Sequence, residues 1–150
     1  MIKVFESIKN NPNHTFYPVK ADAIQKAESN MGIIFPAVLT QFYLSVGYGF
    51  LETHKHNINR IMGPSSVEEF YLGTGQFQNS EEVEIFGYYS KDKLIFFEVN
   101  ESLYISIGIK KFNKGIIYYY DDIIANDLNE FFDQYLKNEG YFLSYSKRQN

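Results

Sequence analysis

The sequence predicts an α+β fold in which helices cover one mainly antiparallel sheet. Apolar residues follow a helical spacing before residue 50, and they form short β-rich runs separated by turns between residues 94 and 120. Helical spacing then returns after residue 126. Helices, then closely spaced strands, then a helix are typical of a sheet with helices on one face. We expect a sheet of about four to six strands, covered by an N-terminal helical hairpin and a C-terminal helix.

The length and the composition favour one compact domain. The chain has 150 residues, of which 45% are hydrophobic, and it contains no repeat or low-complexity linker. We therefore expect a single domain over residues 1–150, with its core over about residues 20–140. No window is apolar enough to suggest a signal peptide or a membrane span, so we expect a cytoplasmic protein.

The first half of the chain carries three helical patterns. A short helix is expected from Ile2 to Lys9, where apolar residues recur every third position. Residues 24–31 and 39–46 then have apolar residues at i, i+3 and i+7, which predicts a helical hairpin. Residue types that commonly begin or end helices surround these two patterns. Gly32 closes the second helix, Pro36 opens the third, and Gly47 and Gly49 end it.

The second half is mainly β in its pattern. A strand at Asn59–Met62 and a short helix at Val67–Leu72 lead into a polar loop over residues 73–80. Four strands that pair mainly antiparallel are then expected, and the third of them alternates as a half-buried strand does. They cover the stretch from Val83 to Tyr89, then Leu94–Val99, Leu103–Ile109 and Ile116–Tyr120, and a helix from Leu128 closes the domain.

No group of residues in the sequence indicates catalysis. The absence of Cys excludes disulfides, thiolate nucleophiles and Cys-based zinc sites. Glu52, His54 and His56 alternate, so an extended chain would place them on one side, but a zinc site needs a further ligand or water and His14 is distant in sequence. We interpret these residues as a solvated strand edge or loop. We expect no enzyme activity, no cofactor and no metal.

Glu28 is a polar residue on the apolar stripe of the second helix. A lone carboxylate is not an acid–base pair. We interpret Glu28 as a structural residue that bonds a nearby turn or an arginine such as Arg60, with a role in binding as the alternative.

The order of these motifs resembles the SUKH superfamily, also called the Smi–Knr family. The similarity rests on a helix with an acidic residue, a Gly-apolar-x-x-Pro connection, a second helix with a Gly-rich end, and a strand followed by a short helix. In this chain the motif reads Ile24-x-x-Ala27-Glu28-x-x-Met31-Gly32-Ile33-x-Phe35-Pro36-x-x-Leu39-x-x-Phe42-Tyr43, followed by Asn59-Arg60-Ile61-Met62-x-Pro64-x-x-Val67-x-x-Phe70-Tyr71. Met31 and Phe35 replace the usual leucines, and Val46-Gly47-Tyr48-Gly49 replaces the usual Asn-Gly-Gly-like end.

The resemblance implies a binding protein. Bacterial members are mostly immunity proteins that neutralise toxins, often nucleases, and fungal members regulate cell-wall synthesis through protein contacts. For this chain it implies an immunity protein that occludes a basic, nuclease-type toxin, with a regulatory scaffold as the alternative. We expect a monomer or weak dimer that binds neither nucleic acid nor a membrane directly, since the net charge is −4 and the basic residues are scattered. The expected contact residues are Glu81, Glu82, Glu84, Tyr88, Tyr48 and Glu52, while Glu28, Gly32, Pro36, Gly47, Gly49 and Asn59 form the structural motif.

Overall fold

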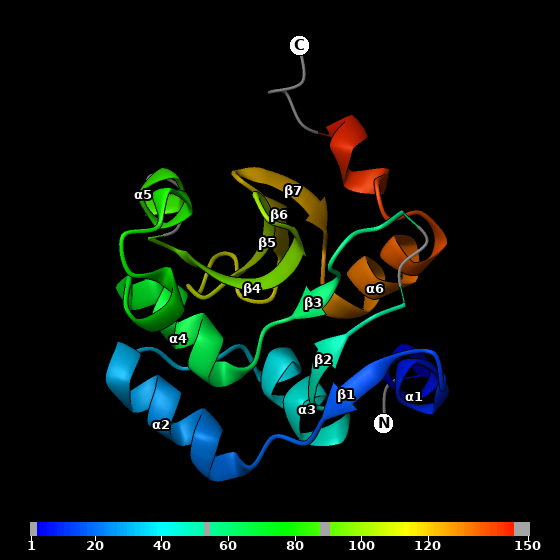
Figure 1. Ribbon diagram of the computed structural model, residues 1–150, viewed down its shortest axis with the longest axis horizontal. Helices are drawn as coiled ribbons and strands as arrows, with labels where there is room; N and C mark the ends of the chain where they lie inside the picture. The colour runs from blue at the N-terminus through cyan, green and yellow to red at the C-terminus, as the bar shows by residue number, and fades with distance from the viewer. Residues whose placement is uncertain (1–2, 53–54, 88–90, 146–150) are drawn as a thin grey trace.

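A computed structural model describes residues 3–52, 55–87 and 91–145 and confirms the predicted α+β class (Figure 1). Within these ranges, seven strands form one antiparallel sheet in the sequential order β1-β2-β3-β4-β5-β6-β7. The strands are β1 Thr15–Tyr17, β2 Tyr48–Phe50, β3 Arg60–Ile61, β4 Lys93–Asn100, β5 Leu103–Gly108, β6 Ile117–Tyr119 and β7 Asp122–Ala125. The helices are α1 Lys3–Asn10, α2 Ala21–Met31, α3 Ala37–Ser45, α4 Pro64–Leu72, α5 Glu81–Gly87 and α6 Leu128–Lys137, with the 3-10 turns η1 Gly75–Phe77 and η2 Tyr141–Tyr145.

One face of the sheet, the inner face, is covered by α1, α3 and α6. Phe42 of α3 lies between α1 and α6, with its ring centroid 5.0 Å from that of Phe5 and 5.1 Å from that of Phe132. Phe131 of α6 contacts Phe97 of β4 at 5.5 Å. All five rings are fully buried, and edge-to-face packing of this kind adds to the free energy of burial.

The opposite, outer face is covered only in part. Phe70 of α4 and Phe86 of α5 lie over Tyr104 of β5, at ring distances of 5.2 and 5.9 Å. The predicted hairpin helices separate here, because α3 goes to the inner face while α2 packs against α4 (Figure 1). Since helices cover both faces of β5, this strand is almost fully buried and not half-buried as its alternation predicts.

The strand expected at Val83–Tyr89 is wrong in the part that the structure describes. Residues 81–87 form the helix α5, with Glu81, Glu82 and Glu84 in its first turn, where the positive end of the helix dipole stabilises carboxylates. The alternation of Val83 and Ile85 is typical of a strand, but the buried residue of this segment is Phe86.

The segment between β6 and the last helix contains a strand that the sequence does not predict. The chain does not pass there directly into the last helix, because β7 begins at Asp122 and pairs with β6. The last helix starts as predicted after Asp127, whose carboxylate accepts the N–H of Glu130 at 2.8 Å. None of the described helices is long and apolar enough to cross a membrane.

Candidate functional site

The uncovered part of the outer face carries three exposed aromatic side chains on β1 and β2. Tyr17, Tyr48 and Phe50 are 46%, 38% and 39% exposed. Antiparallel pairing places Tyr17 opposite Tyr48 and Thr15 opposite Phe50, so these side chains share one face. The rings of Tyr17 and Tyr48 lie 5.4 Å apart. We call these three residues the aromatic patch.

Two glycines bring β1 and β2 close together. Gly47 and Gly49 have φ values of +117° and +150°, which residues other than glycine rarely adopt. A Cβ atom would lie 2.1 Å from the carbonyl oxygen of Tyr17 at Gly47, and 2.1 Å from that of Thr15 at Gly49. The glycines that the sequence assigns to the end of a helix therefore also build the aromatic patch.

A charged pair continues the aromatic patch across the sheet. Arg60 of β3 lies opposite Phe50 on one side and Glu98 of β4 on the other. Arg60 Nε lies 3.0 Å from Glu98 Oε1, although its N–H is not aligned for a hydrogen bond. Tyr104 donates to Glu98 Oε2 at 3.2 Å, and burial and the nearby Glu98 carboxylate raise the pKa of Tyr104. Arg60 thus keeps a partly exposed guanidinium beside the patch.

A hollow of about 510 Å³ adjoins Tyr48. It lies between the start of α2 and the start of α4, and its wall is largely apolar. The ring of Tyr48 packs directly over Gly63, where a Cβ atom would come within 3.1 Å of Tyr48 Cγ. The patch and this hollow together form a surface that can receive the side chains of a protein partner.

The acidic helix α5 lies at the other end of the outer face. Glu82 accepts a hydrogen bond from Ser80 Oγ at 2.9 Å and acts electrostatically on Tyr104, so it faces the sheet. Glu81 and Glu84 instead line a second hollow, together with Phe77. The three carboxylates expected to act together therefore point to two sides of α5. Tyr88, the other residue expected here, lies outside the described residues.

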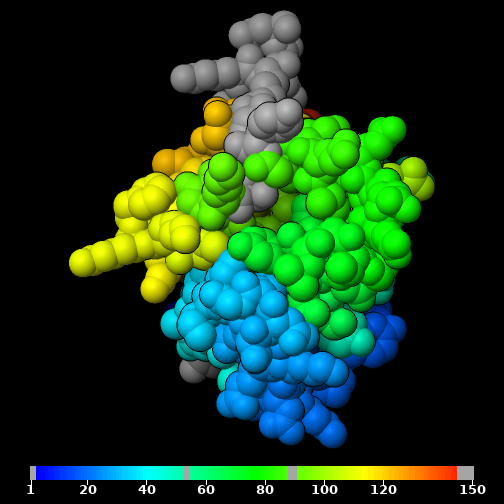
Figure 2. Space-filling model, turned by 90° about the vertical axis from the view of Figure 1, so that its left-hand side faces the viewer, coloured from blue at the N-terminus to red at the C-terminus, as the bar shows by residue number. Residues whose placement is uncertain are grey.

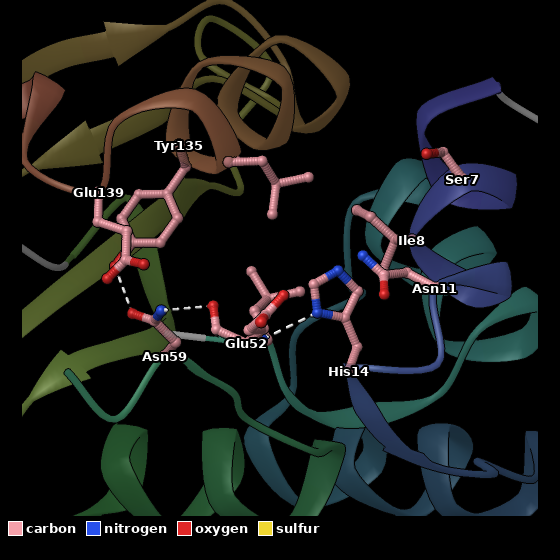
Figure 3. A pocket seen from close by; sticks show the side chains of 10 residues that line it. Ser7, Ile8, Asn11, His14, Glu52, Asn59, Tyr135 and Glu139 are labelled. Atoms are coloured by element: carbon pink, nitrogen blue, oxygen red, sulfur yellow. Dashed lines mark hydrogen bonds between the residues drawn. The ribbon is translucent and has the colours of Figure 1, made fainter. Parts of the chain in front are cut away.

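A polar pocket of about 150 Å³ lies where α1, the end of β2 and the end of α6 meet (Figure 3). Its hydrophobic lining comes from Ile8, Leu51 and Leu136. Its polar lining consists of Ser7, Asn11, His14, Glu52, Asn59, Tyr135 and Glu139. Sequence reasoning names Glu52, Asn59 and His14 but does not bring them together, because the pocket joins segments from opposite ends of the chain.

Hydrogen bonds connect the wall of this pocket. Tyr135 Oη donates to Asn59 Oδ1 at 2.6 Å, and Asn59 Nδ2 donates to the carbonyl oxygen of Glu52 at 3.4 Å. The backbone N–H of Glu52 donates to His14 Nδ1 at 2.9 Å (Figure 3). Burial raises the pKa of Tyr135, helped by the charge of Glu139, and burial lowers the pKa of His14. The network therefore keeps Tyr135 protonated and favours a neutral imidazole.

The alternation of Glu52, His54 and His56 does not produce a shared face in the described part of the chain. His54 lies outside the described residues, and His56 has a φ of +60°, so the chain is not extended there. Glu52 meets His14 instead. Among the described residues, no three His, Asp or Glu side chains are arranged to hold a metal ion.

The residues of the structural motif support the fold around these sites. Glu28 Oε2 accepts the N–H of Phe35 at 2.7 Å, while Arg60 pairs with Glu98. Gly32 ends α2 with a φ of +69°, and Pro36 directly precedes α3.

Comparison with known proteins gives two matches of wide coverage. The model of the SMI1 / KNR4 family (SUKH-1) matches residues 18–134. A relative from Bacillus subtilis (strain 168), "Immunity protein YxxD", is 42% identical over 139 residues, which is 93% of this chain and 95% of the relative. No solved structure matches the chain significantly. Because the family model matches residues 18–134, which is most of the chain, the chain belongs to the SMI1 / KNR4 family.

Proposed function

We propose that this chain is an immunity protein that binds a protein toxin and blocks its active cleft. The observation that carries the proposal is the 42% identity to an immunity protein over nearly the whole of both chains. Identity at this level and coverage supports a common mode of action. We propose that the protein acts by binding and performs no reaction of its own.

The aromatic patch is the surface that we assign to the toxin. Tyrosine, phenylalanine and arginine are enriched where protein interfaces bury most area, because they offer a large contact at a low entropic cost. Tyr48 and Phe50 expose more than a third of their surface on a sheet whose backbone is held in place. The guanidinium of Arg60 beside them can donate to a carbonyl or a carboxylate of the partner.

The charge of the chain suits a basic toxin such as a nuclease. The net charge is −4, and α5 presents Glu81, Glu82 and Glu84 within its first turn. Carboxylates at this end of the outer face would speed the encounter with a basic surface without having to touch it. Glu52, just beyond β2, instead lines the polar pocket. We place this encounter in the cytoplasm, where a delivered nuclease meets its substrate.

Co-expression with any toxin encoded by a neighbouring gene tests the function. The expected result is that the intact chain restores growth and co-purifies with the toxin. A Tyr48→Ser, Phe50→Ser double variant should lose both effects, with at least about a tenfold weaker complex, as when aromatic anchors are removed. The matched control is Ile123→Ser, because Ile123 is 52% exposed on the opposite edge strand, β7. A chain that neither protects nor co-purifies contradicts the immunity role, whereas full protection by the double variant contradicts only the choice of surface.

A further inference from the structure

A rigid basic turn projects from the sheet between β5 and β6. Its residues are Lys110, Lys111, Phe112, Asn113 and Lys114, and we call them the basic turn. Phe112 is 74% exposed, the largest exposure of any large hydrophobic residue that the structure describes. Three lysines in five residues stand out in a chain whose net charge is −4.

Asn113 fixes the shape of this turn. The residue is 1% exposed, and its Oδ1 accepts the N–H of Lys110 at 3.0 Å. Its Nδ2 donates to the carbonyl oxygen of Asp92 at 3.1 Å, which ties the turn to the segment before β4. Because the buried amide holds the backbone, Phe112 is presented to solvent in a defined position and little entropy would be lost on binding.

A complementary surface lies on the same chain. The hollow beside α5 measures about 350 Å³, and we call it the acidic hollow. The buried ring of Phe77 and the side chain of Val83 supply apolar surface, while Glu81 and Glu84 supply carboxylates. Its chemistry matches an aromatic ring flanked by ammonium groups.

We propose that the occupant of the acidic hollow is the basic turn of a second copy of this chain. Phe112 of one copy would enter the hollow of the other, and its neighbouring lysines would pair with Glu81 and Glu84. Figure 2 shows the green surface of α4 and α5 and the yellow basic turn on the same face, with the turn protruding at its edge. A two-fold axis through such a face forms both contacts at once, so the assembly closes as a dimer.

This dimer lies beyond the toxin-binding role and leaves the aromatic patch for the toxin. Helical spacing places the three carboxylates of α5 on two sides of the helix. Glu81 and Glu84, three residues apart, lie on the side of the acidic hollow, whereas Glu82, four residues before Phe86, faces the sheet.

Sedimentation of the purified chain without any toxin tests the dimer. We expect a reversible dimer at low salt that dissociates as salt is raised, because exposed charge pairs are screened. Phe112→Ser should weaken the dimer at least about tenfold. For the lysine-to-glutamate substitutions described next, Lys137→Glu is the matched control, since the Lys137 side chain is 75% exposed on α6. A chain that stays monomeric at low salt and high concentration contradicts the proposal.

A charge swap separates the contact from any loss of folding. Variant one carries Lys110→Glu, Lys111→Glu and Lys114→Glu, and variant two carries Glu81→Lys and Glu84→Lys. Each alone places like charges opposite one another and should be monomeric. Mixed, they restore attraction at both contacts and should form a heterodimer. Failure of two folded variants to associate overturns the proposal, as does a wild-type monomer whose basic turn is instead needed to bind the toxin.

Discussion

At the scale of single residues, Asn59 joins the sheet to the last helix. It is fully buried with a φ of +54°, a left-handed conformation that asparagine tolerates better than most residues. Asn59→Ala should lower the free energy of unfolding by about 2–3 kcal/mol, because it strains the backbone and leaves the Tyr135 hydroxyl without its acceptor. Urea denaturation measures this loss.

Two further variants separate the causes. Asn59→Gly keeps the backbone conformation and removes only the side-chain bonds, and Tyr135→Phe removes only the hydroxyl. Both should be less destabilising than Asn59→Ala. Equal stability of Asn59→Ala and the wild type would show that the network contributes nothing to folding.

His14 should give the protein a defined sensitivity to acid. Burial lowers the pKa of His14 in the folded state below its ordinary 6.5, so the unfolded chain takes up the proton first. The contribution of neutral His14 is therefore complete above about pH 6.5 and is lost progressively as the pH falls below that value. His14→Asn keeps an acceptor for the Glu52 N–H and should remove the part of the pH dependence of the free energy of unfolding that His14 causes. Urea midpoints at a series of pH values measure it, and an unchanged pH dependence would contradict the role of His14.

At the scale of elements, the pairing of β1 with β2 depends on glycine. Gly49→Ala would place Cβ 2.1 Å from the carbonyl oxygen of Thr15, so β1 must move away. Gly32→Ala is the matched control, because Gly32 also has a positive φ but has nothing within 4 Å of its Cβ position. We expect about 1 kcal/mol of destabilisation at Gly32 and at least twice that at Gly49. Hydrogen exchange at Phe16 should rise only in Gly49→Ala, and equal effects at the two glycines would contradict this account.

The same elements show what the sequence could predict. The helices α2, α3 and α6 are long enough for their apolar spacing and their Gly, Pro or Asp ends to be recognised. The strands β1 and β2 have three residues each, too few to show alternation, and only their pairing defines them. The sequence pattern predicts a strand where the acidic helix α5 lies, because seven residues span only two helical turns and show too little of the helical spacing.

The candidate site, like the fold, is predictable from the sequence only in part. Tyr48 and Glu52 were expected from the sequence, but Tyr17 and Phe50 join the patch only through the register of β1 with β2. His14 reaches Glu52 across 38 positions of the sequence. Pairing between distant segments depends on the whole fold, so local spacing does not predict it.

At the scale of the whole molecule, the two proposed interfaces should act independently. The aromatic patch lies on β1 and β2, and the basic turn follows β5, three strands and roughly 14 Å from β2. At such distances the free energies of substitutions usually add. We expect Tyr48→Ser with Phe50→Ser to weaken only toxin binding, and Phe112→Ser to weaken only the dimer. In the combined variant, calorimetry should give the same loss of toxin affinity as Tyr48→Ser with Phe50→Ser, and sedimentation the same loss of dimer affinity as Phe112→Ser. A difference above about 0.5 kcal/mol in either free energy would show that the two interfaces are coupled.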